Sequence, residues 1–229
     1  MSKPQNRKKI RKVEHLESLK EKIYIFSEGQ QTEYLYFKGF ADAINSNAVY
    51  RNLVHIQVYG VGAETLRVIK FAEEYVEKHQ LKNAQIWCVY DRDSFPEQNF
   101  NAVSEKASVL NDKQSDVVYN VAWSNQCIEY WFILHFNFYQ SDNDRKDYRK
   151  FLNTKFEELG WEKYEKNNSE LFNIMTDKGN PKQAIKWAEK RLQECTGLSE
   201  SQSAPATKVH LLVQELAKYL PDTLRKKYL

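Results

Sequence analysis

The chain has 229 residues, of which 41% are hydrophobic and 14% are aromatic. This composition excludes a largely disordered chain, which lacks the apolar surface needed to offset its ordering entropy. The formal net charge of +3 is too small to establish nucleic-acid binding by itself. No stretch reaches the ~18 apolar residues of a membrane-spanning helix, and no apolar run follows the basic N-terminus. We therefore expect no membrane segment, no secretory signal and a cytoplasmic location.

Positive charge is concentrated in an N-terminal arm, residues 1–20, which precedes the first apolar run. Lys8, Lys9 and Arg11 belong to this arm. Such a cluster either contacts a nucleic-acid backbone without reading its sequence or is simply a solvated tail. We name these three residues as candidate substrate contacts.

Strands alternate with helices up to about residue 125. Apolar, β-prone runs predict strands over 22–29, 53–60, 84–91 and 117–124. Helical spacing of apolar residues predicts helices over 31–44, 63–79 and 99–112. Such alternation predicts an α/β fold with a mainly parallel four-stranded sheet flanked by helices. Ligand sites in such sheets lie beyond the carboxyl ends of the strands.

The pattern of residues 126–220 predicts helices. Helices are predicted over 126–136, 144–160, 181–194 and 207–220. No strong linker separates them from the sheet. We therefore expect a sheet domain over residues 21–140 and a helical extension over residues 141–229 that packs on it.

Acidic residues follow two of the predicted strands. Glu28 ends the first strand, next to a glycine, and Asp91 and Asp93 follow the third. Carboxylates gathered at one sheet edge are suited to Mg²⁺ or Mn²⁺, which prefer oxygen ligands. The alternative is a helix cap and a solvated turn. Glu33 in the next helix is a further candidate ligand, or an acid favoured there by the helix dipole.

A third group lies after the fourth strand, in "SNQCIEYWFILHF". Glu129 stands among apolar residues, where a charge is rarely fully buried unless it is paired or bound to metal. It is therefore a candidate catalytic residue. Ser124 and Asn125 are candidate substrate-binding residues or helix caps. For His135, a hydrogen-bonded core histidine is the favoured interpretation over a proton shuttle.

In this order and separation, "IFSEGQQTEYLYF", "WCVYDRDSF" and "WSNQCIEYWFILHF" resemble the RloB/AbiL-type family of bacterial and archaeal defence-associated proteins. The C-terminal "PKQAIKWAEK" and "PATKVHLLVQEL" are similar to the helical tail of that family. The resemblance covers nearly the whole chain after the basic arm.

The resemblance implies a Toprim-like (Rossmann-like) catalytic domain that binds Mg²⁺ and cleaves nucleic-acid phosphodiesters in anti-phage defence. Glu28 matches the Toprim glutamate, and Asp91 and Asp93 match the two aspartates of its DxD motif. Glu33 resembles a second acid of related nucleases. Because related proteins are often encoded beside ATPases, the resemblance also implies an ATPase partner of the ABC or AAA type.

Two other classes of function remain open. The first is a non-catalytic or partner-activated subunit of an ATPase-containing complex; this chain has no GxxxxGK[ST] motif of its own. The second is a nucleotide-sugar transferase, which also holds a metal-bound diphosphate at a DxD motif but leaves Glu28 without a role. The sequence does not choose between DNA and RNA, including transfer RNA, as the substrate, nor does it decide whether the chain forms a homo-oligomer.

Overall fold

A computed structural model describes residues 20–113 and 116–229. The candidate contacts Lys8, Lys9 and Arg11 of the basic arm lie outside the described residues. Within those residues, no helix is both long and apolar enough to cross a membrane.

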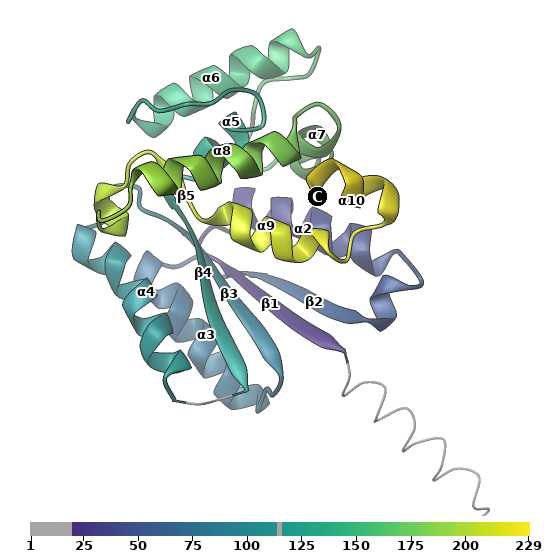
Figure 1. The fold of residues 1–229 in the computed structure, drawn as a ribbon, viewed down its shortest axis with the longest axis vertical. Helices are drawn as coiled ribbons and strands as arrows, with labels where there is room; N and C mark the ends of the chain where they lie inside the picture. Colours follow the sequence, from purple (N-terminus) through teal and green to yellow (C-terminus); the bar gives the residue numbers. More distant parts are fainter. Residues whose placement is uncertain (1–19, 114–115) are drawn as a thin grey trace, which may run out of the picture.

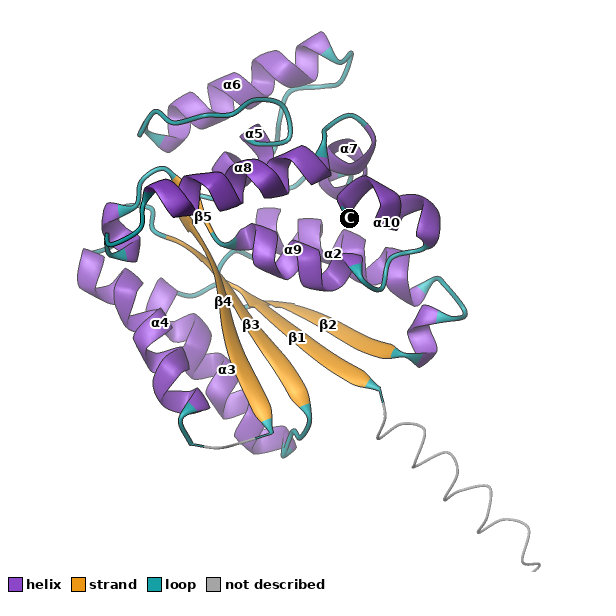
Figure 2. Ribbon diagram, in the orientation of Figure 1, coloured by secondary structure: helices purple, strands orange, loops and turns teal. Residues whose placement is uncertain are grey.

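A five-stranded sheet forms the centre of the described structure (Figures 1 and 2). The strand order is β2-β1-β3-β4-β5; the first four strands pair in parallel, whereas β5 pairs with β4 in the antiparallel direction. The strands are β1 (Glu21–Ser27), β2 (Val54–Gly60), β3 (Ala84–Asp91), β4 (Val117–Asn125) and β5 (Ala206–Thr207). The predicted mainly parallel α/β sheet is confirmed, but the predicted number of four strands is wrong. β5 has only two residues and lies within a polar loop, so it has no hydrophobic alternation from which a strand could be predicted.

Helices cover both faces of this sheet, with α3 and α4 on one face and α2 and α9 on the other (Figure 1). Side chains along β1 alternate between these faces. Tyr24 and Phe26 join the core beneath α3 and α4, while Ile23 and Ile25 join the core beneath α2 and α9. A run without polar residues is expected of a parallel strand buried on both faces. The four helices are α2 (Thr32–Asn45), α3 (Thr65–His79), α4 (Glu97–Asn111) and α9 (Val209–Ala217).

The remaining helices gather on the side of α2 and α9, away from α3 and α4 (Figure 2). They pack against α2 through aromatic side chains: the Phe40 and Phe172 rings lie 4.6 Å apart, and Trp131 Nε1 donates to the Tyr36 hydroxyl at 3.0 Å. One buried apolar cluster therefore joins residues from both halves of the chain. These helices are α5 (Glu129–Ile133), α6 (Arg145–Glu158), α7 (Leu171–Asp177), α8 (Pro181–Glu194) and α10 (Asp222–Tyr228), with short 3-10 turns η1 (Tyr50–Asn52) and η2 (Glu200–Gln202).

Candidate functional site

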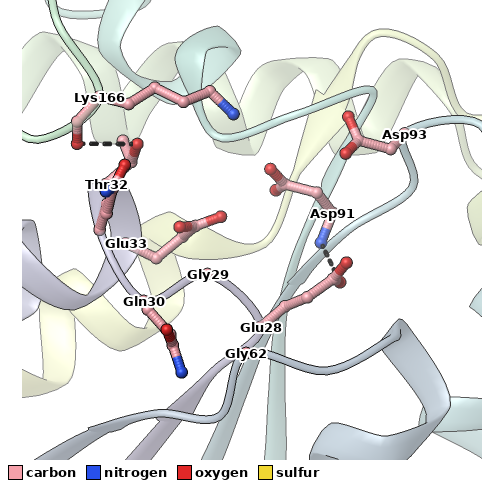
Figure 3. Close-up of a pocket in the computed structure, with 10 residues that line it drawn as sticks. Glu28, Gly29, Gln30, Thr32, Glu33, Gly62, Asp91, Asp93 and Lys166 are labelled. Carbon is pink, nitrogen blue, oxygen red and sulfur yellow. Dashed lines mark hydrogen bonds between the residues drawn. The ribbon is translucent and has the colours of Figure 1, made fainter.

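Glu28 and Asp91 meet at the carboxyl ends of two neighbouring strands. β1 and β3 pair in parallel, and the Glu28 backbone N–H donates to the Val89 carbonyl at 2.9 Å. The backbone N–H of Asp91 then donates to Glu28 Oε2 at 3.4 Å (Figure 3). Parallel pairing thus brings together two acids that are far apart in the sequence.

A cavity of about 320 Å³ opens at this edge. Four carboxylates line it: Glu28 and Glu33 from the β1–α2 segment, and Asp91 and Asp93 from the end of β3 (Figure 3). Lys166, in the loop between α6 and α7, extends over the cavity from the opposite side. The four acids predicted as metal ligands therefore share one cavity.

Asp91 is the most constrained of these acids. It is only 7% exposed, and its Oδ2 accepts the Ile128 backbone N–H at 3.2 Å. Its Oδ1 is buried and makes no hydrogen bond of good geometry with a described residue, although the Asp91 and Glu33 side chains lie close enough for a hydrogen bond between them to moderate the raised pKa of Glu33. Burial, reinforced by the charges of Glu33 and Asp93, raises the pKa of Asp91 well above its usual range. A cation at Oδ1 would satisfy the free oxygen and offset the repulsion.

The pKa values of the two glutamates are also displaced upward. Burial raises the pKa of Glu28 to about 7, although the Asp91 N–H works in the opposite direction. Burial also raises the pKa of Glu33, with a smaller contribution from the charge of Glu129. A carboxylate with a pKa near 7 exchanges protons readily at neutral pH, as a general acid or base must.

Asp93 is held by an unusual backbone conformation and by an ion pair. Its φ is +43°, a left-handed value that aspartate tolerates better than most residues. Its N–H donates to the Gln126 carbonyl at 3.0 Å, and its Oδ1 lies 3.0 Å from Nη1 of Arg145 in α6. The second acid of the DxD motif is thus directed into the cavity with a cation already beside it.

Glu129 lies behind the cavity rather than in its lining. It is 1% exposed and accepts from Arg149 Nε at 3.1 Å. The expectation that this charge is paired is confirmed, with arginine as its partner. Its charge contributes to the raised pKa values of Asp91 and Glu33, which places it close to both. Its catalytic role stays a prediction.

A family profile described as "RloB-like protein" matches residues 23–216. The chain belongs to the RloB-like protein family. The match includes all four cavity acids, Glu129 and the two arginines of α6 that pair with Asp93 and Glu129. No curated protein and no solved structure matches the chain.

In this RloB-like protein, Ser124 and Asn125 are fully buried and do not line the cavity. The Ser124 hydroxyl lies 3.1 Å from that of Thr207, and Asn125 Nδ2 donates to the carbonyls of Glu200 and Ser201 at 3.0 and 2.9 Å. These bonds hold β5 and η2 against the end of β4. Substrate contact, as predicted from the sequence, would require both side chains to leave these bonds.

His135 is a core histidine, as favoured from the sequence. It is 2% exposed, and its Nδ1 lies 3.0 Å from the Trp131 carbonyl. Burial lowers its pKa to about 4, so the ring is neutral at neutral pH. Its place in the core beside α5 accounts for it without a role in the cavity.

Three cations of the RloB-like site were not predicted from the sequence. Arg145 and Arg149 stand four residues apart on α6, so both lie on one helical face. That spacing was the only feature of the sequence that could have indicated that these two arginines act together. The position of Lys166 depends on a tertiary contact alone. Its backbone carbonyl accepts a hydrogen bond from the Thr32 hydroxyl at 3.1 Å, which holds the loop beside the start of α2.

The donor set fits a hard divalent cation that brings its own water. Among the described residues, no three or more His, Cys, Asp or Glu side chains are arranged to hold a metal by themselves. Mg²⁺, however, typically keeps several waters and takes one or two carboxylates plus substrate phosphate oxygens. Glu28 and Asp91, with its unpartnered oxygen, meet that smaller requirement.

Gly29 is needed because the Glu33 carboxylate occupies the space of its missing side chain. A Cβ at this position would overlap Glu33 Oε2. We expect Gly29→Ala to lower the free energy of unfolding by about 1 kcal/mol, since the Glu33 carboxylate must turn out of its preferred position toward the cavity that it lines. Urea unfolding followed by circular dichroism measures the change.

The matched control is the same substitution in a Glu33→Ala background, where the overlap is gone. There the cost of Gly29→Ala should fall to about 0.5 kcal/mol or less. An equal cost in both backgrounds would show that Glu33 does not fill the space beside Gly29.

Proposed function

We propose that this RloB-like protein is a Mg²⁺-dependent nuclease of the Toprim type that cleaves nucleic-acid phosphodiesters. The observation that carries the proposal is the buried, unpartnered Oδ1 of Asp91, beside Glu28 in an acid-lined cavity at the strand ends. Acids alone would repel a polyanion. A cavity lined by acids is therefore suited to a phosphate when a cation lies between the acids and the phosphate.

Asp91 and Glu28 are the proposed ligands of Mg²⁺ or Mn²⁺, with Asp93 and Glu33 completing the negative surroundings. A cation bound there would polarise a phosphate and lower the pKa of a bound water. The alternative role for Glu28 is to take or return a proton from outside the coordination shell, since its pKa in the metal-free chain is about 7 and a bound cation would lower it. Lys166 reaches over the same cavity and supplies positive charge for the phosphate.

A partner-activated subunit is the second candidate, favoured by one observation. Arg145 already pairs with Asp93, so the chain alone holds part of its acidic edge in a neutralised state. An ATPase partner could change the position of α6 and release that pair. The defence role and the ATPase partner remain proposals drawn from the sequence resemblance, and the cytoplasmic location remains a proposal drawn from the lack of a predicted membrane segment and secretory signal.

A cleavage assay tests the nuclease proposal. The purified chain is incubated with plasmid DNA and with total transfer RNA in Mg²⁺, Mn²⁺ or EDTA, beside Asp91→Ala. We expect metal-dependent cutting of one substrate, reduced at least ~100-fold by the substitution because the loss of a metal ligand removes several kcal/mol of transition-state stabilisation.

The two controls separate the candidates. Undiminished cutting in EDTA, or by a well-purified Asp91→Ala protein, would contradict the assignment of the site. No cutting of either substrate until an ATPase partner is added would favour the subunit instead.

A further inference from the structure

Helix α6 presents two arginines to the acids of the site. Arg145 Nη1 lies 3.0 Å from Asp93, and Arg149 Nε lies 3.1 Å from Glu129. The helix begins at Arg145, and Asp144 caps it by accepting the Lys146 backbone N–H at 2.8 Å. The start of α6 therefore lies beside the cavity acid Asp93 and beside Glu129, and Asp144 caps it there.

These two ion pairs differ in burial. The two arginines are similarly exposed, Arg149 to 35%, but Glu129 is only 1% exposed, so a loss of Arg149 would leave the Glu129 charge buried without a partner. The other pair is open to solvent, with side-chain exposures of 45% for Arg145 and 25% for Asp93. Exposed pairs of this kind contribute only ~0–1 kcal/mol. Arg149 thus anchors α6, whereas Arg145 is free to exchange its partner.

The surroundings of Asp93 favour such an exchange. Asp93 shares the cavity with Glu28, Glu33 and Asp91, and its charge contributes to the raised pKa of Asp91. At the same separation, a divalent cation attracts the Asp93 carboxylate more strongly than one guanidinium does, since it carries twice the charge. The released guanidinium would remain on α6 within reach of Asp93, and therefore close to a phosphate bound to a cation in this cavity.

We propose that Arg145 is an exchangeable counterion that pairs with Asp93 until a divalent cation and a nucleic-acid phosphate enter, and that it then binds the phosphate. This inference rests on the proposed function and adds a residue that positions the substrate. Arginine suits the role because its planar guanidinium forms two parallel hydrogen bonds to a phosphate. The exchange also keeps the charge of the site balanced, with the cation compensating the carboxylates and Arg145 the incoming phosphate.

Arg145→Ala should change two binding constants in opposite directions. Mn²⁺ affinity, measured by isothermal titration calorimetry without nucleic acid, should increase about threefold, because the competing cation is gone. Affinity for a fluorescein-labelled single-stranded oligonucleotide, measured by anisotropy in Ca²⁺ with DNA and RNA versions, should decrease about tenfold through loss of a charge-assisted phosphate contact.

Two further variants define the controls. Lys146→Ala removes the same charge from the next residue of α6, which is exposed, and should change each constant less than about twofold. Arg145→Lys keeps the charge but lacks the planar pair of donors. It should leave Mn²⁺ affinity close to that of the wild type and recover only part of the oligonucleotide affinity.

The outcomes separate this inference from the nuclease proposal. If Arg145→Ala weakens both ligands, or leaves Mn²⁺ affinity unchanged, the counterion exchange is wrong while the metal site stands. Opposite shifts like those expected would support the exchange even if the chain cuts nothing, and only the nuclease proposal would then be lost. Failure of the wild-type chain to bind Mn²⁺ would overturn both.

Discussion

Asp91→Asn is expected to stabilise the metal-free protein and to abolish its metal-dependent activity. The substitution keeps the shape of the side chain and an oxygen to accept the Ile128 N–H. It removes a carboxyl that, without metal, must either be ionised in a buried place beside Glu33 and Asp93 or take up a proton at neutral pH, because its pKa is raised well above its usual range. Because a buried charge without compensation is costly, the free energy of unfolding in EDTA should rise by about 1 kcal/mol.

The gain in stability should disappear when the metal is present. Ligands that bind only the folded state stabilise it by mass action, so Mg²⁺ should raise the melting temperature of the wild-type chain. It should leave Asp91→Asn nearly unchanged, and cleavage by that variant should fall at least ~100-fold. Differential scanning calorimetry in EDTA and in Mg²⁺, together with the cleavage assay, measures the three quantities.

Asp112→Asn is the matched control, since Asp112 is an exposed aspartate at the end of α4. It should raise the stability by no more than about 0.5 kcal/mol, through the loss of a negative charge at the helix C-terminus, in EDTA and in Mg²⁺ alike, and it should not change the response to Mg²⁺. A strongly destabilised Asp91→Asn protein would contradict the prediction, because Asp91 would then contribute to folding through its charge.

Arg149→Met should destabilise the protein by about 3 kcal/mol. The substitution keeps an apolar stem of similar length but removes the donor that pairs with Glu129. Glu129 is 1% exposed and cannot turn to water without disrupting the surrounding aromatic core. Breaking a buried ion pair from one side leaves an uncompensated charge, which is the costly case. Urea unfolding at neutral pH gives the difference.

The double variant Glu129→Gln/Arg149→Met tests the cause. Without the carboxylate there is no buried charge to compensate, so most of the lost stability should return. Arg145→Met should cost less than about 1 kcal/mol, since its pair with Asp93 is exposed. If the double variant is as unstable as Arg149→Met alone, the arginine stabilises α6 through packing and not through its charge.

Local patterns in the sequence determined the sheet and the acids at its edge. Uninterrupted apolar runs predicted β1 and β3, and their parallel pairing placed Glu28 next to Asp91. This prediction succeeds because hydrophobic periodicity is local and crossover connections are almost always right-handed. The helix over 126–136 was predicted too long: β4 continues to Asn125 and α5 spans only Glu129–Ile133.

Only the tertiary structure decided which cations face those acids. Arg145, Arg149 and Lys166 reach the site from α6 and the loop after it, which are distant in sequence from the strands. It also decided that Ser124 and Asn125 hold β5 and η2. The periodicity of hydrophobic residues indicates whether a segment has an apolar face. It does not indicate which distant segment will pack against that face. The sequence alone therefore determined the acidic half of the site, whereas the cationic half depended on how the C-terminal helices pack against the sheet.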